Sequence, residues 1–190
     1  MDTENIAITT LGTICEIIAG QSPEGRFYNK KGEGLPFYQG KKEFSQKFIG
    51  QPKIWTTVAT KVAYENDILI SVRAPVGPVN FATQKACIGR GLAIIRGGNK
   101  INKDYLFHFL QFNEKKIVGN LGAVFSSITK RDIENIEISL PSLSRQQAIV
   151  SHLDALFSQA KRLEEIYKQK LVTLEELKKS ILNKAFAGEL

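Results

Sequence analysis

Histidine and cysteine, the side chains that most often perform or support catalysis, are scarce and poorly spaced in this sequence. The two histidines, His108 and His152, lie inside apolar helix-like segments (YLFHFL and IVSHLD), where a packed or surface histidine is the expected role. Cys15 and Cys87 form no CxxC pair and stand among apolar residues, which is typical of packing cysteines. The sequence therefore predicts no nucleophile–base pair, no disulfide framework and no metal site.

Motifs for phosphate binding and methyl transfer are missing as well. The sequence has no GxxxxGK[ST] loop, no FxGxG turn and no (D/N)PP(Y/F) tetrapeptide, and Ile88–Leu92 (IGRGL) is too short for dinucleotide binding. Glu176 and Lys178 form a Glu-x-Lys pair, but no Pro-Asp precedes them as a nuclease site would require. We therefore expect neither catalytic residues nor a cofactor in this chain, and we interpret it as a binding protein.

Positive charge is concentrated in the N-terminal part of the chain. The net charge is +7, and residues 24–61 hold eight basic residues against three acidic ones. From residue 144 onward, basic and acidic residues nearly balance. This asymmetry predicts that the N-terminal part faces a polyanion such as a nucleic acid. No stretch is apolar enough to span a bilayer and the N-terminus is acidic and polar, so a cytoplasmic protein is expected.

The elements that must position these basic residues divide near Pro141. Residues 1–141 contain short apolar runs separated by Gly and Pro, which indicates an α+β domain of mixed strands and many turns. The expected strands are Thr13–Ile18, Asp67–Val72, Val79–Thr83, Leu92–Arg96 and Ile136–Leu140, and the expected helices are Lys103–Glu114 and Lys130–Asn135.

Residues 142–190 are predicted to form one long helix. Ser144 and Gln147 fit a capping box at its start, and neither Gly nor Pro follows until Gly188, which is well placed to end it. At 1.5 Å per residue such a helix is roughly 64 Å long. A helix of that length cannot be covered by its own small domain.

A seam of mostly apolar residues runs along this helix with alternating spacings of four and three. A repeat of 3.5 residues sustained over this length predicts a coiled coil with a partner helix. A single amphipathic helix lying on its own domain would account for the first turns but not for the far end. The seam, in which Lys170 is the single charged residue, consists of Ile149, Leu153, Leu156, Ala160, Leu163, Tyr167, Lys170, Leu174, Leu177 and Ile181.

Five segments carry a resemblance to a known family. Gly122–Val150 (GAVFSSITKRDIENIEISLPSLSRQQAIV) joins a short helix to a strand that ends in Leu-Pro and then to the long helix. The other four are Leu11–Ser22 (LGTICEIIAGQS), Ser71–Gly77 (SVRAPVG), Cys87–Leu92 (CIGRGL) and Leu177–Leu190 (LKKSILNKAFAGEL). Together they resemble one target recognition domain and one conserved helix of the specificity subunits of type I restriction-modification enzymes. The resemblance covers nearly the whole chain.

The resemblance implies a protein that recognises double-stranded DNA without catalysis. Modification subunits, which bring S-adenosylmethionine, would methylate adenine, and restriction subunits would translocate and cleave. Family members usually contain two recognition domains and two helices, whereas this chain supplies one of each, as a natural half subunit, a truncated gene product or an expressed fragment. Two copies are expected to pair through antiparallel long helices, as a homodimer whose interface contains Ile149, Leu153, Leu156, Leu163, Tyr167, Leu174, Leu177 and Ile181.

Given a recognition domain, the side chains expected to touch DNA are basic, amide or hydroxyl groups in its loops. Gln39, Lys41 and Lys42 follow the aromatic pair Phe37-Tyr38, which could hold their loop rigid. Arg73 and Arg90 fit either DNA contact or a role in holding strand turns. The candidates are Arg26, Lys30, Lys31, Gln39, Lys41, Lys42, Arg73, Arg90, Ser126, Ser127 and Lys130, the last three before a helix N-terminus suited to a phosphate.

Three other functions remain open on the sequence. One is a coiled-coil adaptor whose basic domain binds protein or RNA and shows no salt-sensitive preference for a duplex. Another is an autonomous DNA-binding regulator that never meets a methyltransferase. The third is the recognition portion of a fused restriction-methylase.

Overall fold

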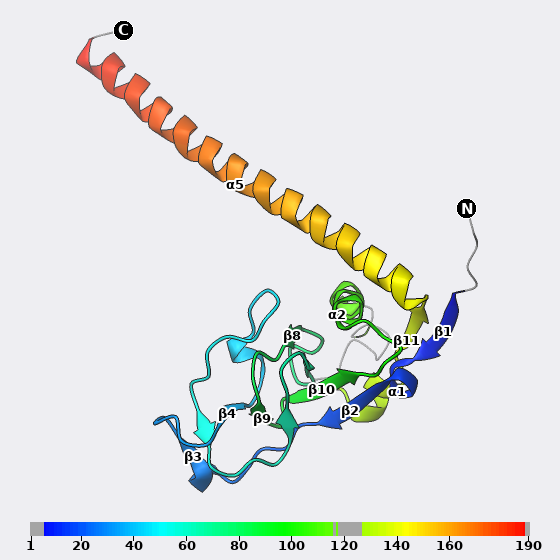
Figure 1. Cartoon of the computed structure of the whole chain (residues 1–190). Coiled ribbons are helices and arrows are strands. Elements are labelled where there is room, and N and C mark those ends of the chain that lie inside the picture. The colour runs from blue at the N-terminus through cyan, green and yellow to red at the C-terminus, as the bar shows by residue number, and fades with distance from the viewer. Residues whose placement is uncertain (1–5, 116, 118–126, 189–190) are drawn as a thin grey trace. The chain divides into compact units, whose positions relative to one another are not determined.

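The computed structural model describes residues 6–115, 117 and 127–188, and its contacts divide the chain into two compact units, Met1–Gln147 and Ala148–Leu190. Mixed sheets followed by a long helix confirm the expected α+β class (Figure 1). The strands are β1 (Ala7–Thr10), β2 (Cys15–Ala19), β3 (Tyr28–Asn29), β4 (Leu35–Tyr38), β5 (Trp55–Thr56), β6 (Val62–Ala63), β7 (Ile68–Ser71), β8 (Val79–Phe81), β9 (Ala86–Ile88), β10 (Leu92–Gly97) and β11 (Glu137–Leu140). The helices are α1 (Leu11–Ile14), η1 (Gly25–Phe27), η2 (Lys41–Glu43), α2 (Lys103–Phe112), α4 (Lys130–Glu134) and α5 (Leu143–Ala187).

A four-stranded sheet of order β2-β10-β7-β8 forms the centre of the first unit. Strand β10 pairs antiparallel with both β2 and β7, and its residues Leu92, Ala93, Ile94 and Ile95 are all buried. Successive side chains of a strand point to opposite faces, so Ala93 and Ile95 join the core beneath α2, whereas Leu92 and Ile94 join a second core. Burial on both faces is the reason why this strand reads as a continuous apolar run.

A second sheet, of order β3-β5-β4-β9-β6, packs its side chains into that second core. Its central pair, β4 and β9, is parallel, with Tyr38 opposite Ile88. Phe37 and Tyr38 are buried, and the Tyr38 hydroxyl donates to the carbonyl oxygen of Gly50 at 3.0 Å. The aromatic pair therefore anchors the loop that begins at Gln39, as the sequence predicted.

The first unit differs from the sequence-based expectation at its N-terminal end and in the second sheet, whose strands β3, β4, β5 and β6 were not expected. The expected strand Thr13–Ile18 was wrong at its start, because Leu11–Ile14 forms the short helix α1 and the strand runs over Cys15–Ala19. Strand β1 was not expected at all, and it pairs with β11 so that Ala7 lies opposite Leu140. A strand of four residues whose partner lies at the other end of the domain carries little local signal.

The long helix α5 begins earlier than its expected cap. It starts at Leu143, and the amide of Gln146 donates to the carbonyl oxygen of Ser142 at 2.9 Å, so Ser144 lies inside the first turn instead of before it. The predicted capping box of Ser144 and Gln147 was therefore wrong. The side chain of Gln146 is fully buried and donates to the carbonyl oxygens of Lys100 and Pro141 at 3.1 and 2.9 Å. These bonds tie the first turn of α5 to the first unit.

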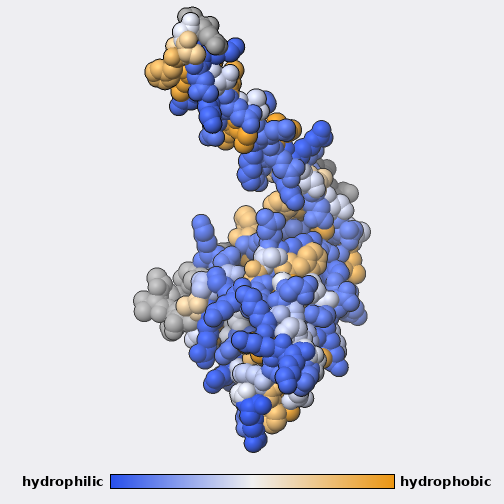
Figure 2. All heavy atoms as spheres, turned by 90° about the vertical axis from the view of Figure 1, so that its left-hand side faces the viewer, coloured by the Kyte–Doolittle hydropathy of each residue, from blue (hydrophilic) through white to orange (hydrophobic). Residues whose placement is uncertain are grey.

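The rest of α5, in the second unit, carries its apolar seam on the surface of the single chain. Leu163, Tyr167 and Leu174 expose 54%, 62% and 60% of their area. Figure 2 shows orange apolar side chains interspersed with blue polar ones along this helix. Apolar exposure repeated over so many turns marks a surface for association.

The reactivity of the Cys15 thiol, on β2, is a measure of how well the core of the first unit is buried. Burial raises the pKa of its thiol from 9.0 to about 11, although a backbone hydrogen bond from Gly98 acts in the opposite direction. Because the thiolate is the reactive form, each unit of increase lowers its fraction tenfold, and we expect alkylation by iodoacetamide at pH 8 to be about 100-fold slower than for an unperturbed thiol. Peptide-resolved mass spectrometry of the native and urea-unfolded chain measures this. Equal labelling rates in the two states would contradict the burial.

Candidate nucleic-acid interface

The ends of four strands meet at the start of β10. The antiparallel pairing places Ala19, the last residue of β2, opposite Ala93, and Ser71, the last residue of β7, opposite Leu92. Strand β9 leads into β10 through residues 89–91, and the parallel strand β4 ends beside β9. The loops that follow these strands are therefore brought together. We call residues 20–22, 39–40, 72–73 and 89–91 the strand junction.

Backbone hydrogen bonds hold the strand junction together. The amide of Gly91 donates to the carbonyl oxygen of Gln39 at 3.0 Å, and the carbonyl oxygen of Gly91 accepts from the amide of Val72 at 3.0 Å. The amide of Arg90 donates to the hydroxyl of Ser22 at 3.2 Å. A single glycine thus links two loops that are far apart in the sequence, and the backbone under each side chain of the junction is fixed.

Close packing at Gly91 requires the absence of a side chain. A Cβ atom at this position would lie 2.4 Å from the carbonyl oxygen of Gln39. Because that oxygen accepts the Gly91 amide, a methyl group would push the two loops apart and break the bond. Glycine therefore allows the loop of Gln39 to lie directly against the β9–β10 turn.

Long polar side chains stand exposed on this fixed backbone. Gln39, Arg73 and Arg90 are all exposed, and they come from three different loops. Within the described part of the chain, neither arginine has a carboxylate at ion-pair distance. The junction therefore presents two cationic groups and one amide, the groups that bind phosphates and base edges. The exposed Gln21 joins them, and sequence reasoning missed it.

The signal that could have revealed Gln21 is its position between Gly20 and Ser22. The amide of Gln21 donates to the carbonyl oxygen of Ile88 at 2.9 Å, and its own carbonyl oxygen accepts from the Thr60 hydroxyl. A glycine followed by two polar residues at the end of a buried strand fits a loop in any protein, so the pattern by itself does not indicate a binding residue. Only the pairing of β2 with β10 places this loop beside Arg90.

The other predicted basic residues lie outside the strand junction. Lys41 and Lys42 belong to η2, which follows Gly40 directly and so continues the Gln39 loop. Lys30 and Lys31 lie in a turn organised by Asn29, whose side-chain oxygen accepts from the amides of Lys31 and Glu33 at 3.1 Å.

Arg26 differs from these lysines because its charge is already paired. Its guanidinium forms an ion pair with Glu24 at 3.0 Å and lies 4.9 Å from the centre of the Phe27 ring. Arg26 would have to break its ion pair with Glu24 before its whole charge could attract a phosphate.

The predicted phosphate site before α4 is arranged differently from expectation. Ser126 lies outside the described residues, and Ser127 is exposed and bridges Arg73. The N-terminus of α4 is capped by Thr129 and Asp132, which form a capping box, so a carboxylate already occupies the place expected for a phosphate. Lys130 is paired with Glu134 at 3.4 Å.

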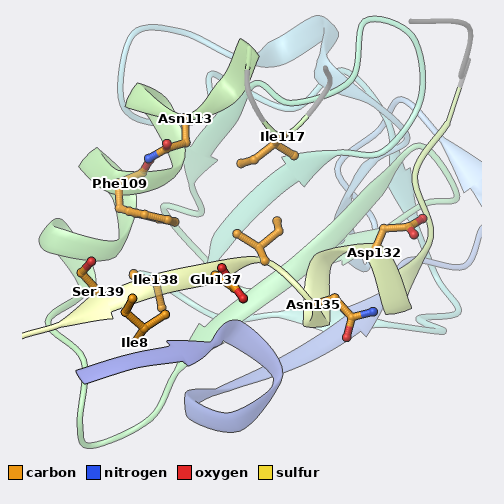
Figure 3. A pocket seen from close by; sticks show the side chains of 10 residues that line it. Ile8, Phe109, Asn113, Ile117, Asp132, Asn135, Glu137, Ile138 and Ser139 are labelled. Carbon is orange, nitrogen blue, oxygen red and sulfur yellow. The ribbon is translucent and has the colours of Figure 1, made fainter. Parts of the chain in front are cut away.

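A separate hollow lies between α2, α4, β11 and β1 (Figure 3). The Asp132 carboxylate accepts from the amide and hydroxyl of Thr129 at 2.7 Å, and Asn113 donates to the carbonyl oxygen of Phe109 at 2.9 Å. These side chains already form hydrogen bonds with residues three or four positions away in their own segments, so we assign the hollow no chemistry. Its described lining consists of Ile8, Phe109, Asn113, Ile117, Asp132, Asn135, Ile136, Glu137, Ile138 and Ser139.

No helix among residues 6–115, 117 and 127–188 is long and apolar enough to cross a membrane. The same residues contain no group of three or more His, Cys, Asp or Glu side chains arranged to hold a metal ion.

The sheets, the strand junction and the seam-bearing helix define a class of protein. Over residues 3–175 the chain matches the type I restriction modification DNA specificity domain, and it belongs to that family. The resemblance of its segments to specificity subunits is thereby confirmed.

Individual relatives agree with this assignment. The chain is 45% identical over 178 residues to the type I restriction enzyme MjaX specificity subunit of Methanocaldococcus jannaschii, covering 92% of this chain and 40% of that protein. The crystal structure of the HsdS subunit from Thermoanaerobacter tengcongensis matches with a TM-score of 0.83 and 39% identity, covering 99% of this chain and 46% of that one. A structure describing assembly and conformational transition of a type I R-M system matches with a TM-score of 0.88 and 40% identity, over 100% and 48% of the two chains. The chain thus spans about half the length of these relatives.

Proposed function

We propose that this chain is the DNA-recognition half of a type I restriction-modification specificity subunit, and that it has no catalytic activity. It acts in the cytoplasm with partner subunits. Modification subunits, which hold the S-adenosylmethionine, methylate adenine at the site that this chain selects, and the restriction subunit cleaves unmodified DNA. Family membership supports the assembly, and the observation that carries DNA recognition is the strand junction with its exposed Gln39, Arg73 and Arg90.

In the strand junction, the charged side chains bind phosphates and the amide side chain forms hydrogen bonds with bases. Arg73 and Arg90 lie on backbone held by the bonds of Gly91 and Ser22, so the backbone that carries their guanidinium groups loses little conformational freedom when they bind phosphates. Gln39 extends from the anchored end of β4 and can donate to and accept from the edge of an adenine. Lys41 and Lys42, just beyond it, add charge along the same backbone.

Two copies of the chain act together in this proposal. Among residues 6–115, 117 and 127–188, no other segment covers the exposed apolar seam of the long helix, and a second copy supplies a partner. Antiparallel pairing of the two α5 helices then gives a spacer with one recognition domain at each end. Such a dimer reads two identical half-sites in inverted orientation, at a separation that the helix length sets.

The experiment that tests the function uses methylation as the readout. The purified chain is mixed with the modification subunit from the same operon and S-adenosylmethionine, and methylated adenines are mapped on random-sequence DNA. We expect a bipartite motif with identical inverted halves. Two different halves would show that a second, different specificity chain is required. No methylation and no association with the modification subunit would overturn the assignment.

Removal of Arg90 tests the strand junction directly. We expect Arg90→Ala to weaken duplex binding about tenfold and to lower the slope of log affinity against log salt by about one, because one phosphate contact is lost. Fluorescence anisotropy with a labelled duplex over a range of salt concentrations measures both. The control is Arg162→Ala, which removes the same charge from the exposed surface of α5. Equal effects of the two changes would mean that net charge, and not the junction, governs binding.

A further inference from the structure

The turn that joins β3 to β4 carries two exposed lysines that do not belong to the strand junction (Figure 1). We infer that this turn, residues 29–34, is a second DNA contact, in which Lys30 and Lys31 bind phosphates whatever the base sequence and Asn29 positions them. The inference rests on the proposed function, because it adds a contact to the same recognition domain. We call residues 29–34 the lysine turn.

The side chain of Asn29 closes the lysine turn on itself. Its oxygen accepts from the amides of Lys31 and Glu33, both at 3.1 Å, and its nitrogen donates to the carbonyl oxygen of Glu33 at 2.8 Å. Three hydrogen bonds from one side chain thus fix the backbone around both lysines. An exposed turn without them would sample many conformations and would lose that freedom on binding.

Both ends of the lysine turn are held on β5. Tyr28, the residue before Asn29, pairs with Thr56 of β5, and its ring stacks on that of Phe37 with the ring centres 4.8 Å apart. At the other end, Gly34 has a φ of 86°, and a Cβ atom there would lie 2.2 Å from the carbonyl oxygen of Thr56. The turn is therefore a fixed part of the domain surface.

The lysine turn is also connected to the strand junction. The Tyr28 hydroxyl donates to the carbonyl oxygen of Pro23 at 2.8 Å, and Pro23 directly follows junction residues 20–22. The four residues of β4 separate the turn from Gln39, a length of about 13 Å. Phosphates of one DNA strand are spaced about 3.4 Å apart along the helix axis, so contacts this far apart span about four base pairs. One duplex is therefore long enough to touch both places.

The charges of the lysine turn favour a phosphate as its ligand. Lys30, Lys31 and Glu33 are exposed, and within the described part of the chain none of them forms an ion pair. An ammonium group on a flexible stem binds as a point charge, which suits a phosphate better than the edge of a base. A phosphate attracts the two ammonium groups and repels the Glu33 carboxylate, so removing these charges should have opposite effects.

Variants of these charges provide the test. Lys30→Ala combined with Lys31→Ala should weaken duplex binding about 50-fold at about 0.1 M salt and lower the slope of log affinity against log salt by about two. Glu33→Gln should tighten binding about threefold, because it removes a carboxylate and keeps the backbone groups that Asn29 binds. The control is Lys178→Ala combined with Lys179→Ala, which removes the same charge from the exposed surface of α5 outside the seam and should change neither quantity.

Fluorescence anisotropy of the full-length chain measures these effects on two labelled duplexes of equal length, one with the motif mapped by methylation and one of random sequence. A phosphate contact weakens binding to both by the same factor. Loss of binding to the motif alone would mean that the lysines read bases, and weaker binding by Glu33→Gln would mean that its carboxylate contacts the DNA. Either result overturns the phosphate assignment.

The positioning role of Asn29 is tested in two backgrounds. Asn29→Ala should weaken binding about fivefold in the wild-type chain and have little further effect once Lys30 and Lys31 are alanine, because the residues it positions are then gone. The same fold-change in both backgrounds would show that Asn29 supports only the fold and would overturn this role. Circular dichroism melts check that the variants are folded.

The inference and the proposed function fail in different ways. If the wild-type chain binds a duplex and the double-lysine variant binds it equally well, the lysine turn is not a DNA contact and the recognition function stands. If that variant binds DNA normally but no longer supports methylation by the modification subunit, the turn contacts the partner protein and the inference is again overturned. A wild-type chain that binds no duplex overturns both.

Discussion

Gly20→Ala is expected to destabilise the first unit by about 3 kcal/mol or more, which corresponds to a fall in melting temperature of roughly 10 °C for a domain of this size. A Cβ atom at Gly20 would lie 2.2 Å from the carbonyl oxygen of Gly89 and 2.6 Å from that of Leu92. Both are backbone atoms, and the Gly20 amide donates to the Leu92 oxygen at 3.0 Å. The methyl group can fit only if β2 separates from the start of β10.

Thermal and urea unfolding of the full-length chain, followed by circular dichroism, measures this effect. Gly25→Ala is the matched control, since nothing lies within 4 Å of a Cβ atom there and we expect a change within about 0.5 kcal/mol. Because Gly20 begins one loop of the strand junction, any folded Gly20→Ala protein should also bind a duplex less tightly. A Gly20→Ala chain as stable as wild type would show that the ends of β2 and β10 are not packed as described.

Arg96→Met is expected to cost about 3 kcal/mol of stability, because it leaves a carboxylate buried without its cation. The Arg96 guanidinium, on β10, donates to both side-chain oxygens of Asp67 at 2.9 and 2.7 Å, and the Asp67 side chain is only 6% exposed. Hydrogen bonding to Asp67 raises the pKa of Arg96 still further, so the cation persists at every pH at which the protein is folded. The same guanidinium lies 5.0 Å from the centre of the Tyr64 ring.

Two further variants separate charge from packing at this site. Glu16, the second carboxylate bound to Arg96, has a side chain that is 60% exposed, and we expect Glu16→Gln to cost less than about 0.5 kcal/mol. Asp67→Asn combined with Arg96→Met should recover part of the lost stability, because it removes the buried charge while an oxygen remains to accept the Tyr64 amide. Urea unfolding of the wild type, Asp67→Asn, Arg96→Met and the variant with both changes completes a double-mutant cycle. Strictly additive losses would mean that the ion pair is not the cause.

Some features of the fold required only local information. The seam of α5 repeats over nearly the whole helix, and the run Leu92–Arg96 is buried on both faces, so periodicity and hydropathy were enough to predict both elements. Weaker local signals were misinterpreted. Ser144 has the residue type of a helix cap, but the helix starts at Leu143, two residues closer to β11 than that cap implies, and the buried side chain of Gln146 bonds to the carbonyl oxygen of Pro141 there.

The sequence by itself determined the α+β class, the long helix with its seam, the position of the positive charge and the family resemblance, because each depends on neighbouring residues or on segments compared one at a time. Only the tertiary structure decided which of the many exposed polar residues stand together. Gln39, Arg73 and Arg90 lie in three loops joined by hydrogen bonds of Gly91 to Gln39 and Val72. Those contacts depend on the pairing of β10 with β2 and β7 and of β4 with β9, strands that are separated by long stretches of chain and therefore leave no local signal.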